Sequence, residues 1–385
     1  MHCRQPADAR PPQVFVAMLL ASALCVGMAG SQRTAVASGF TLMNESREIE
    51  QGRKLDAEIG KKLGFYTDAK LQSYVSEVGR RLVRAGSPRS FEYELKIVDM
   101  AEENAFASMG GFVYITRGML AELNSEAELA GVLAHEIGHI SARHVPKQLT
   151  RQLLGMGAML GAMALGATVR SPSSNLDKAP LALSALLAQV MYSYSQEAEL
   201  EADEQGLFLA AQAGYDPRVL VGFLRSFRMK ERLTGTGYHG MLATHPESTE
   251  RVAKAEVLAQ ILASQTPART IGGDTYKAHL DGLPYGKRED RLRLALYTVQ
   301  PDDTVPGISQ KLLGEGGKVW DVARLNRLRS DDPLQAGMLL KIVVPDDRPL
   351  RLPQRRLDMY QERPDASSQP PPRPTRGSRI PYPTD

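Results

Sequence analysis

Two histidines and one glutamate stand at a spacing that suits metal-dependent hydrolysis. The segment reads His135-Glu136-Ile137-Gly138-His139, and residues four apart lie one turn apart on the same face of an α-helix. Both imidazoles can therefore reach one ion, while Glu136 can take a proton from water that attacks a carbonyl polarised by Zn²⁺. The pattern predicts one zinc ion per chain, with Glu136 as the general base. The alternative, two core histidines without a metal, would be costly in a buried helix.

A third protein ligand is expected, because catalytic zinc has three and leaves the fourth place to water. The acidic segment 197–204 is its best source. Helical spacing puts Glu199 and Asp203 one turn apart on one face, so one carboxylate could bind the ion and the other could hold an imidazole. Spacing alone does not choose one carboxylate, and a solvated acidic face accounts for most of them.

The combined motifs resemble a known family, over about residues 45–260. A His-Glu-x-x-His helix followed by Glu-x-x-Ala-Asp in the acidic segment is similar to the HtpX/BepA-like, CAAX-prenyl-protease-type gluzincin zinc metallopeptidases. The other segments that carry the likeness are Asn104-Ala105-Phe106-Ala107, Gly110-Gly111 before a Val-Tyr-Ile-Thr strand, and Thr244-His245-Pro246. The resemblance implies that Glu199 is the third zinc ligand and that Asp203 supports the ligands from beside it.

The resemblance also places His245 near the ion, where two roles are open. Its imidazole could be an inhibitory fourth ligand in the resting enzyme, or a donor to the transition state. A Thr-His-Pro turn that starts the following helix is the simpler alternative. Arg251 fits the same family pattern as a supporting residue, although an arginine beside acidic residues is usually a structural ion pair.

Hydrophobic periodicity predicts the elements that position these residues. The expected helices and strands cover 45–84, 91–97, 112–116, 125–144, 180–213 and 247–263. Ser125 and Glu128 form a capping box at the start of the motif helix, which is apolar nearly all round and should be buried. Strand 112–116 is either an edge to which a substrate peptide adds or an ordinary core strand. The fold class is therefore α+β: a mainly helical zincin-type domain with a small antiparallel sheet.

A second, smaller domain resembles a LysM module with a βααβ core. Its likeness rests on the segment that starts at Tyr297 and on the run from Gly337 to Ile342. The resemblance implies binding of N-acetylglucosamine-containing glycans such as peptidoglycan. Two departures are Asp302, which replaces a glycine, and Pro306, where the first helix should start. The predicted boundaries are 1–37 for a signal peptide, 38–263 for the peptidase, 264–296 for a linker, 297–345 for the LysM-like domain and 346–385 for a Pro-rich disordered tail.

The N-terminus indicates export. An apolar run is followed by Ala35-Val36-Ala37, a small-x-small pattern that predicts cleavage after Ala37, with an uncleaved anchor as the alternative. Both cysteines lie in that leader, so the mature chain needs no disulfide. The formal net charge of +3 gives no reason to expect a nucleic-acid partner. Residues 153–169 are rich in Gly, Ala, Met and Leu, which suits a lid or hairpin over the site, or contact with a membrane.

These observations favour a zinc-dependent endopeptidase of the periplasm that cleaves misfolded or unassembled envelope proteins. One alternative is an envelope chaperone or assembly factor whose low proteolytic activity is gated by His245. Another is a glycan-anchored scaffold with a structural zinc ion. An intact Glu136 argues against the scaffold, because a structural site has no use for a base beside its ion.

Overall fold

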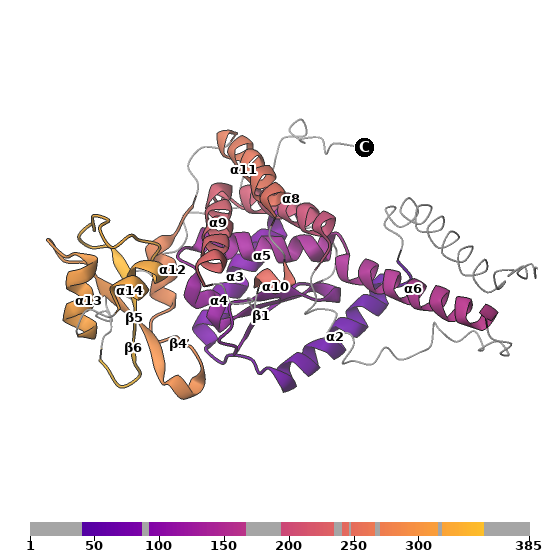
Figure 1. The fold of residues 1–385 in the computed structure, drawn as a ribbon, viewed down its shortest axis with the longest axis horizontal. Helices are drawn as coiled ribbons and strands as arrows, with labels where there is room; N and C mark the ends of the chain where they lie inside the picture. The colour runs from indigo at the N-terminus through magenta and orange to yellow at the C-terminus, as the bar shows by residue number, and fades with distance from the viewer. Residues whose placement is uncertain are drawn as a thin grey trace, which may run out of the picture.

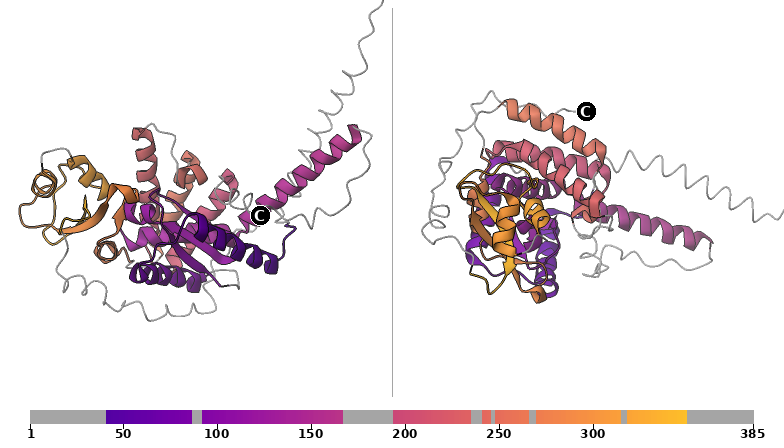
Figure 2. Two further views of the ribbon diagram at one scale, coloured as in Figure 1. Left: turned by 90° about the horizontal axis from the view of Figure 1, so that it is seen from below. Right: turned by 60° about the vertical axis from the view of Figure 1, so that its left-hand side comes forward.

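The computed structural model describes residues 41–86, 92–166, 194–234, 241–245, 248–265, 270–314 and 318–349. The predicted signal peptide at 1–37, the helix start at Pro180 and the Pro-rich tail from 350 onward lie outside these residues. The described chain forms a helical body with a smaller C-terminal part at one end. Helix α6 (His144–Gly166) extends from the other end (Figures 1 and 2).

The predicted helical region 45–84 is two helices, α2 (Glu45–Lys62) and α3 (Ala69–Gly86). They separate at Gly64, whose φ of 76° suits glycine and interrupts a helix. Asp68 Oδ1 then accepts a hydrogen bond from the N–H of Leu71 and starts α3. The apolar stripe of α3 is buried in the core: Leu71, Val75, Val78 and Leu82.

A three-stranded sheet has the order β1 (Glu94–Val98), β3 (Phe112–Thr116), β2 (Ala105–Ala107). β2 pairs antiparallel with β3 whereas β1 pairs with it in parallel, so the sheet is mixed rather than antiparallel throughout. The turn η1 (Met109–Gly111), with Gly110 at a φ of 78°, folds β2 back onto one side of β3 and leaves the other side for β1. β3 is central and buried along its length, so the hypothesis that it is a free edge is wrong.

Helix α5 (Glu126–Ser141) carries the His-Glu-x-x-His motif through the middle of the body. It begins at the predicted cap, where Ser125 Oγ accepts from the N–H of Glu128 at 3.2 Å. The carboxylate of Glu128 accepts from the N–H of Asn124 at 2.7 Å, one residue before the cap, so the reciprocal bond to Ser125 of a capping box is replaced by a bond to its neighbour. Every residue from Glu126 to Ile140 is buried, as the all-round apolar pattern predicts.

Helix α8 (Gln196–Gln212) packs closely along α5 because glycines lie at the contact. A Cβ on Gly206 would lie 2.9 Å from the backbone nitrogen of His135, and one on Gly138 would lie 3.0 Å from the carbonyl oxygen of Ala202. This approach lets carboxylates of α8 reach the imidazoles of α5. The neighbouring helices are α4 (Arg117–Glu122), α9 (Pro217–Thr234), α10 (Met241–Thr244) and α11 (Thr249–Ser264).

The apolar segment predicted as a lid, a hairpin or a membrane contact is helical as far as it is described. Residues 153–166 continue α6 as one helix that projects from the body (Figure 2), so this part of the segment forms no hairpin over the site. None of the helices in the described ranges is both long and apolar enough to cross a membrane.

The C-terminal part has the predicted βααβ core, with one strand added. Its sheet has the order β4-β5-β6, and both pairings are antiparallel. The elements are β4 (Pro284–Tyr285), β5 (Leu292–Thr298), α13 (Val305–Leu313), α14 (Val319–Leu325) and β6 (Leu339–Pro345). Pro306 fits the first turn of α13, where the missing N–H costs nothing. Asp302 has a φ of 67°, a conformation that favours glycine.

The prediction of a linker over 264–296 does not hold for the described residues from Thr270 onward. They contain α12 (Gly273–His279), whose Tyr276 is fully buried and donates from its hydroxyl to the Leu120 carbonyl at 2.7 Å. β4 and the start of β5 follow. Polar composition suggested a loop here, but one aromatic side chain anchors the segment in the core.

The C-terminal sheet docks on the body beside the start of α5. Lys341 of β6 is buried, and its Nζ donates to the carbonyls of Ala121 at 2.6 Å and Leu123 at 2.7 Å. Lysine Nζ thus satisfies carbonyls at the end of α4, which a helix terminus leaves without partners. Arg324 forms an ion pair with Glu122 across the same contact. The two parts are therefore joined by specific polar contacts as well as by apolar packing.

Candidate metal centre

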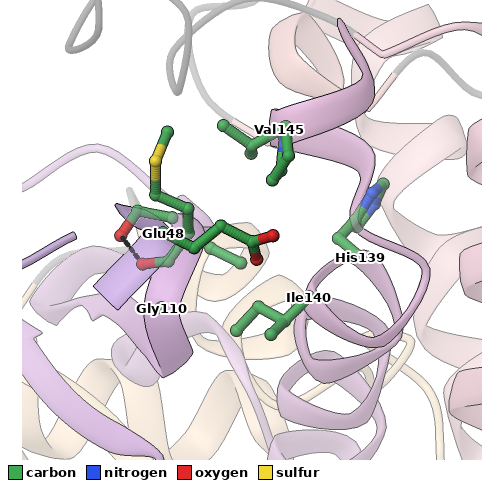
Figure 3. A pocket seen from close by; sticks show the side chains of 9 residues that line it. Glu48, Gly110, His139, Ile140 and Val145 are labelled. Carbon is green, nitrogen blue, oxygen red and sulfur yellow. Dashed lines mark hydrogen bonds between the residues drawn. The ribbon is translucent and has the colours of Figure 1, made fainter. Parts of the chain in front are cut away.

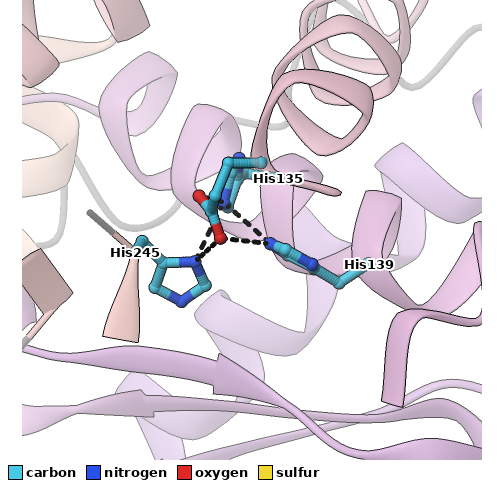
Figure 4. Close-up of side chains that lie close together, drawn as sticks. His135, His139 and His245 are labelled. Carbon is cyan, nitrogen blue, oxygen red and sulfur yellow. Dashed lines mark hydrogen bonds and ion pairs between the residues drawn. The ribbon is translucent and has the colours of Figure 1, made fainter. Parts of the chain in front are cut away.

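Four predicted site residues converge from three parts of the chain (Figure 4). His135 and His139 lie on α5, Glu199 lies on α8, and His245 follows α10. One donor atom of each side chain lies within 4.8 Å of those of the other three, and all four residues are buried. The fold gathers around one point residues that are far apart in the sequence.

The separations between these donor atoms suit one tetrahedral ion. His135 Nε2 lies 3.1 Å from His139 Nε2 and 3.3 Å from His245 Nδ1. Glu199 Oε1 lies 2.9 Å from His245 Nδ1 and 3.5 Å from His139 Nε2. A tetrahedron whose metal–ligand bonds are about 2.0–2.1 Å has edges of roughly 3.3–3.4 Å. The residues present therefore fit a four-coordinate metal ion.

The protonation of two of the candidate ligands, Glu199 and His139, suits a metal. Burial raises the pKa of Glu199, but His245 and the hydrogen bonds from His135 and His245 outweigh it and hold that pKa well below its usual range. Burial lowers the pKa of His139 well below the ordinary value. Glu199 is thus a carboxylate and His139 a neutral imidazole, the forms that bind metals. His135 differs: burial lowers its pKa, but hydrogen bonds with Asp203 and Glu199 outweigh this and raise the pKa to about 10, so a metal would have to displace a proton from this ring.

Asp203 and Arg251 contact the candidate ligands His135 and Glu199 and hold their orientation. Asp203 Oδ1 lies 3.0 Å from His135 Nδ1, so the carboxylate can hold the ring with Nε2 toward the centre. Arg251 Nε donates to Asp203 Oδ2 at 2.7 Å, and its Nη1 lies 2.7 Å from Glu199 Oε2. Only 2% of Arg251 is exposed. This guanidinium is therefore a buried bridge between two site carboxylates rather than a surface ion pair.

Glu136 is buried and its carboxylate is poorly satisfied. Neither oxygen has a hydrogen-bond partner among the residues that the structure describes. Oε1 lies 3.4 Å from His245 Nε2. Burial raises the pKa of Glu136 above its ordinary value. A buried carboxylate without hydrogen-bond partners is costly, which is expected where it serves chemistry rather than stability.

Two further residues of the centre escaped the sequence reasoning. Tyr194 stacks on His139 with 4.0 Å between ring centroids, and its buried hydroxyl has no hydrogen-bond partner in the described part of the chain. His144 is also buried, and its Nδ1 lies 2.8 Å from His139 Nδ1. His144 follows the motif closely enough to have been a candidate. Tyr194 has no comparable local signal.

A small pocket opens beside the centre, between α2, η1 and the junction of α5 with α6 (Figure 3). His139 and Ile140 form its wall on the α5 side, and Val145 lies at the start of α6. Glu48 of α2 faces them across the pocket (Figure 3). This carboxylate forms an ion pair with Arg143, so the polar group in the pocket is held in place.

The centre contains every residue predicted for the site, and none of them lies elsewhere. The residues it brings together are His135, Glu136, His139, Glu199, Asp203, His245 and Arg251.

Two family comparisons match the two parts of the chain. The sequence profile of peptidase family M48 matches residues 67–259, which is half of the chain. The chain belongs to peptidase family M48. The profile of the LysM domain matches residues 297–343. The helical body is therefore an M48 domain, and the C-terminal part is a LysM domain whose matched region begins within β5.

Relatives of this M48 chain include bacterial and mitochondrial proteases. The "Beta-barrel assembly-enhancing protease" of Yersinia pestis is 31% identical over 68% of this chain and 54% of its own length. The protein of that name from Escherichia coli K12 is 29% identical over 57% of this chain and 45% of its own. The "Mitochondrial metalloendopeptidase OMA1" of Arabidopsis thaliana is 34% identical over 44% of this chain and 33% of its own. The chain spans about half the length of the bacterial relatives.

Proposed function

We propose that this protein is a zinc-dependent endopeptidase. The observation that carries the proposal is the convergence of His135, His139 and Glu199 beside a buried, unsatisfied Glu136. Two imidazoles, one carboxylate and an adjacent base form the set that a catalytic zinc site needs. Donor separations near the edge of a zinc tetrahedron and membership of family M48 support it.

The chain's own residues supply the proton transfers and the orientation. A bound zinc ion would polarise the scissile carbonyl and make water more acidic. Glu136 takes a proton from the attacking water and passes it to the leaving amine, a role that its raised pKa suits at neutral pH. Asp203 holds His135, and Arg251 holds both Asp203 and Glu199 in position. Burial of all these groups excludes bulk water from them.

We propose His245 as a fourth ligand of the resting enzyme. Its Nδ1 lies among the ligand atoms, and its Nε2 lies 3.4 Å from Glu136 Oε1. The imidazole thus occupies the space between the ligands and the base, where the attacking water must stand. Activity would then require His245 to move aside. The alternative role, a donor to the transition state, would place the ring next to the ligand atoms instead of among them.

The substrates we propose are misfolded or unassembled proteins of the cell envelope, met in the periplasm. The support is threefold: an export-like N-terminus at 1–37, a LysM domain, and two bacterial relatives named for β-barrel assembly. In this proposal the LysM domain binds peptidoglycan and keeps the enzyme near the wall. The projecting helix α6, rich in small and apolar residues, is the proposed site of contact with lipid.

A chaperone or assembly factor with restrained proteolysis is the second candidate function. The position of His245 favours it, since an enzyme whose water site is filled at rest would cleave slowly.

Zinc content and proteolysis together test the proposal. We expect about one zinc ion per chain by inductively coupled plasma mass spectrometry, and casein cleavage that is lost in Glu136→Gln. Zinc without cleavage in the wild type, before and after removal of His245, would favour the assembly factor. Cleavage by Glu136→Gln at the wild-type rate would exclude the mechanism.

A further inference from the structure

Helix α8 carries a third carboxylate close to the centre, Glu201, which has no role in the mechanism above. Glu199 lies among the ligands and Asp203 contacts His135. Glu201 points elsewhere: its side chain is 46% exposed, and its Oε2 lies 3.1 Å from His144 Nε2. The other ring nitrogen of that histidine, Nδ1, lies 2.8 Å from His139 Nδ1. An unbroken chain of polar contacts therefore runs from a predicted ligand to the protein surface.

Counting protons fixes the direction of every hydrogen bond in this chain. If His139 Nε2 binds the metal, the ring binds it as a neutral imidazole and must carry its one proton on Nδ1. The Nδ1–H must then donate to His144 Nδ1, which is an acceptor. His144 consequently carries its own proton on Nε2, and donates it to Glu201 Oε2. One arrangement of protons satisfies both contacts at once.

We propose that His144 and Glu201 are positioning residues for the metal ligand His139. Glu201 selects the tautomer of His144, and His144 holds the His139 ring so that Nε2 faces the other ligands. This inference rests on the proposed zinc site. It gives the two histidines of the motif matching supports from one helix, since Asp203 holds His135 directly and Glu201 holds His139 through His144.

The local fold brings His144 to this place. Arg143 has a φ of 58°, outside the helical range, so the helical path is interrupted between the end of α5 and the start of α6. Across this turn the ring of His144 contacts His139, although five positions do not match the helical repeat. Glu48 forms an ion pair with Arg143 and holds the turn against α2.

In the described part of the chain, water has little access to His139 and cannot readily replace this contact. His139 is 1% exposed and its ring is stacked under Tyr194. A Nδ1–H deprived of His144 would be left as a buried donor without an acceptor, which is costly. The ring would then rotate or shift, and the ligand set would lose its geometry. The contact between His144 and Glu201 differs, because water can reach Glu201 and can accept part of the hydrogen bonding from His144 in its place.

Zinc affinity of matched variants tests this positioning role. His144→Leu removes both contacts, and we expect zinc to bind about 10–100-fold more weakly, the loss seen when partners of ligand histidines are removed. His144→Asn keeps an acceptor at the position of Nδ1 and should recover most of that loss. Glu201→Met should weaken binding less than His144→Leu does, and Glu204→Met, on the same helix and exposed, is the control. Competition with a chromophoric chelator measures each affinity in the folded full chain.

A spectroscopic readout separates positioning from packing. In Co²⁺-substituted protein the visible d–d bands report ligand geometry, and we expect them to change in His144→Leu and to return in His144→Asn. Wild-type affinity and bands in His144→Leu would overturn the inference. Equal losses in the leucine and asparagine variants would overturn it too, because the ring would then act by shape alone. A wild-type chain that binds no zinc would instead defeat the proposed function from which the inference starts.

Discussion

Two glutamates on helix α5 show how one helix serves two purposes. Glu126, at the N-terminal end, accepts hydrogen bonds from Tyr74, Tyr215 and Arg81 at 2.8–3.0 Å. Glu136, nearer the other end, is equally buried and has no hydrogen-bond partner among the described residues. The hydrogen-bonding capacity of the Glu126 carboxylate is thus used by its neighbours, whereas that of Glu136 is free, within the described chain, for a substrate or water.

The charged groups around the two ends of α5 differ in the same way. Around the start of α5, cations meet carboxylates one to one, as in the pairs Arg324–Glu122 and Arg327–Glu128. Around Glu136, three imidazoles lie 3.4–3.5 Å from the carboxylates of Glu199 and Glu136, and neither oxygen of Glu136 has a hydrogen-bond partner among the described residues. A cation at the centre would offset part of the cost of burying these carboxylates. Buried charge alone is thus a weak sign of function, and incomplete pairing is the better one.

Removing the Glu136 carboxylate should have the largest effect on catalysis. Glu136→Gln keeps the side-chain shape but cannot accept a proton, so we expect zinc to stay bound while kcat/KM for an unfolded substrate falls by about 10²–10⁴-fold or more. The measurement is casein cleavage beside zinc analysis of the same preparation. Glu126→Gln, at the other end of α5, is the matched control and should alter stability rather than turnover per folded molecule. Similar losses of turnover in both variants would contradict a specific catalytic role for Glu136.

The next effect concerns the carboxylate that completes the ligand set. Glu199→Gln should lose zinc affinity far more than Glu197→Gln or Glu201→Gln, because one carboxylate of α8 lies among the donor atoms. Glu201→Gln keeps an oxygen that can accept from His144, so its effect should be small. Chelator competition on the three variants measures the order. If all three variants retained zinc equally, Glu199 would not be the third ligand.

The variant His245→Ala tests whether His245 binds the metal as a fourth ligand in the resting enzyme. If the imidazole is a resting ligand, its removal opens the fourth position, and basal proteolysis should rise while zinc binds more weakly. A transition-state donor predicts the reverse: kcat falls by a factor equivalent to about 2–4 kcal/mol of barrier, with little change in KM. Steady-state kinetics with saturating zinc distinguish the two. Unchanged kcat and KM would leave His245 as a turn residue only.

The smallest expected effect lies at the docking contact, and it depends on pH. Burial lowers the pKa of Lys341 to about 7, against the opposing charges of Glu122 and Glu128. The unfolded lysine titrates near about 10.4. Between these values the unfolded chain binds more protons at this group than the folded chain, so the free energy of unfolding rises with pH.

Lys341→Met should remove that rise and destabilise the protein by about 1–3 kcal/mol, because the carbonyls of Ala121 and Leu123 lose their donor. Urea unfolding at pH 7, 8 and 9 measures both effects. The gap between wild type and variant should widen with pH, whereas Lys311→Met, at an exposed site, should show no such trend. Parallel curves for wild type and Lys341→Met would contradict the assignment.

Local patterns predicted the motif helix and its cap, because both depend on neighbours within one or two turns. His135, Glu136 and His139 belong to this class, as do Ser125 and Glu128. Family resemblance, and not spacing, selected Glu199 from its acidic segment. The structure places it there because glycines on both helices let α8 approach α5.

The sequence reasoning failed where the outcome depends on distant contacts. Parallel pairing of β1 makes β3 a central strand, and no local signal in residues 112–116 reveals it. Buried Tyr276 and Lys277 make an apparently loop-like segment part of the core, through hydrogen bonds to the carbonyls of Leu120 and Leu339. His144 contacts His139 across the break in helical geometry at Arg143, so helical periodicity does not predict this contact.

The docking of the LysM domain through Lys341 fixes the distance between that domain and the metal centre. The domain is fixed near the first turn of α5, and two of the proposed metal ligands, His135 and His139, lie on the same helix, with His139 about 20 Å from its start. If the LysM domain binds a glycan strand, as proposed, the metal centre would lie at a fixed distance from that strand. A flexible linker would let the centre reach a wide volume, whereas this fixed contact would restrict the proposed cleavage to substrates at one distance from the glycan.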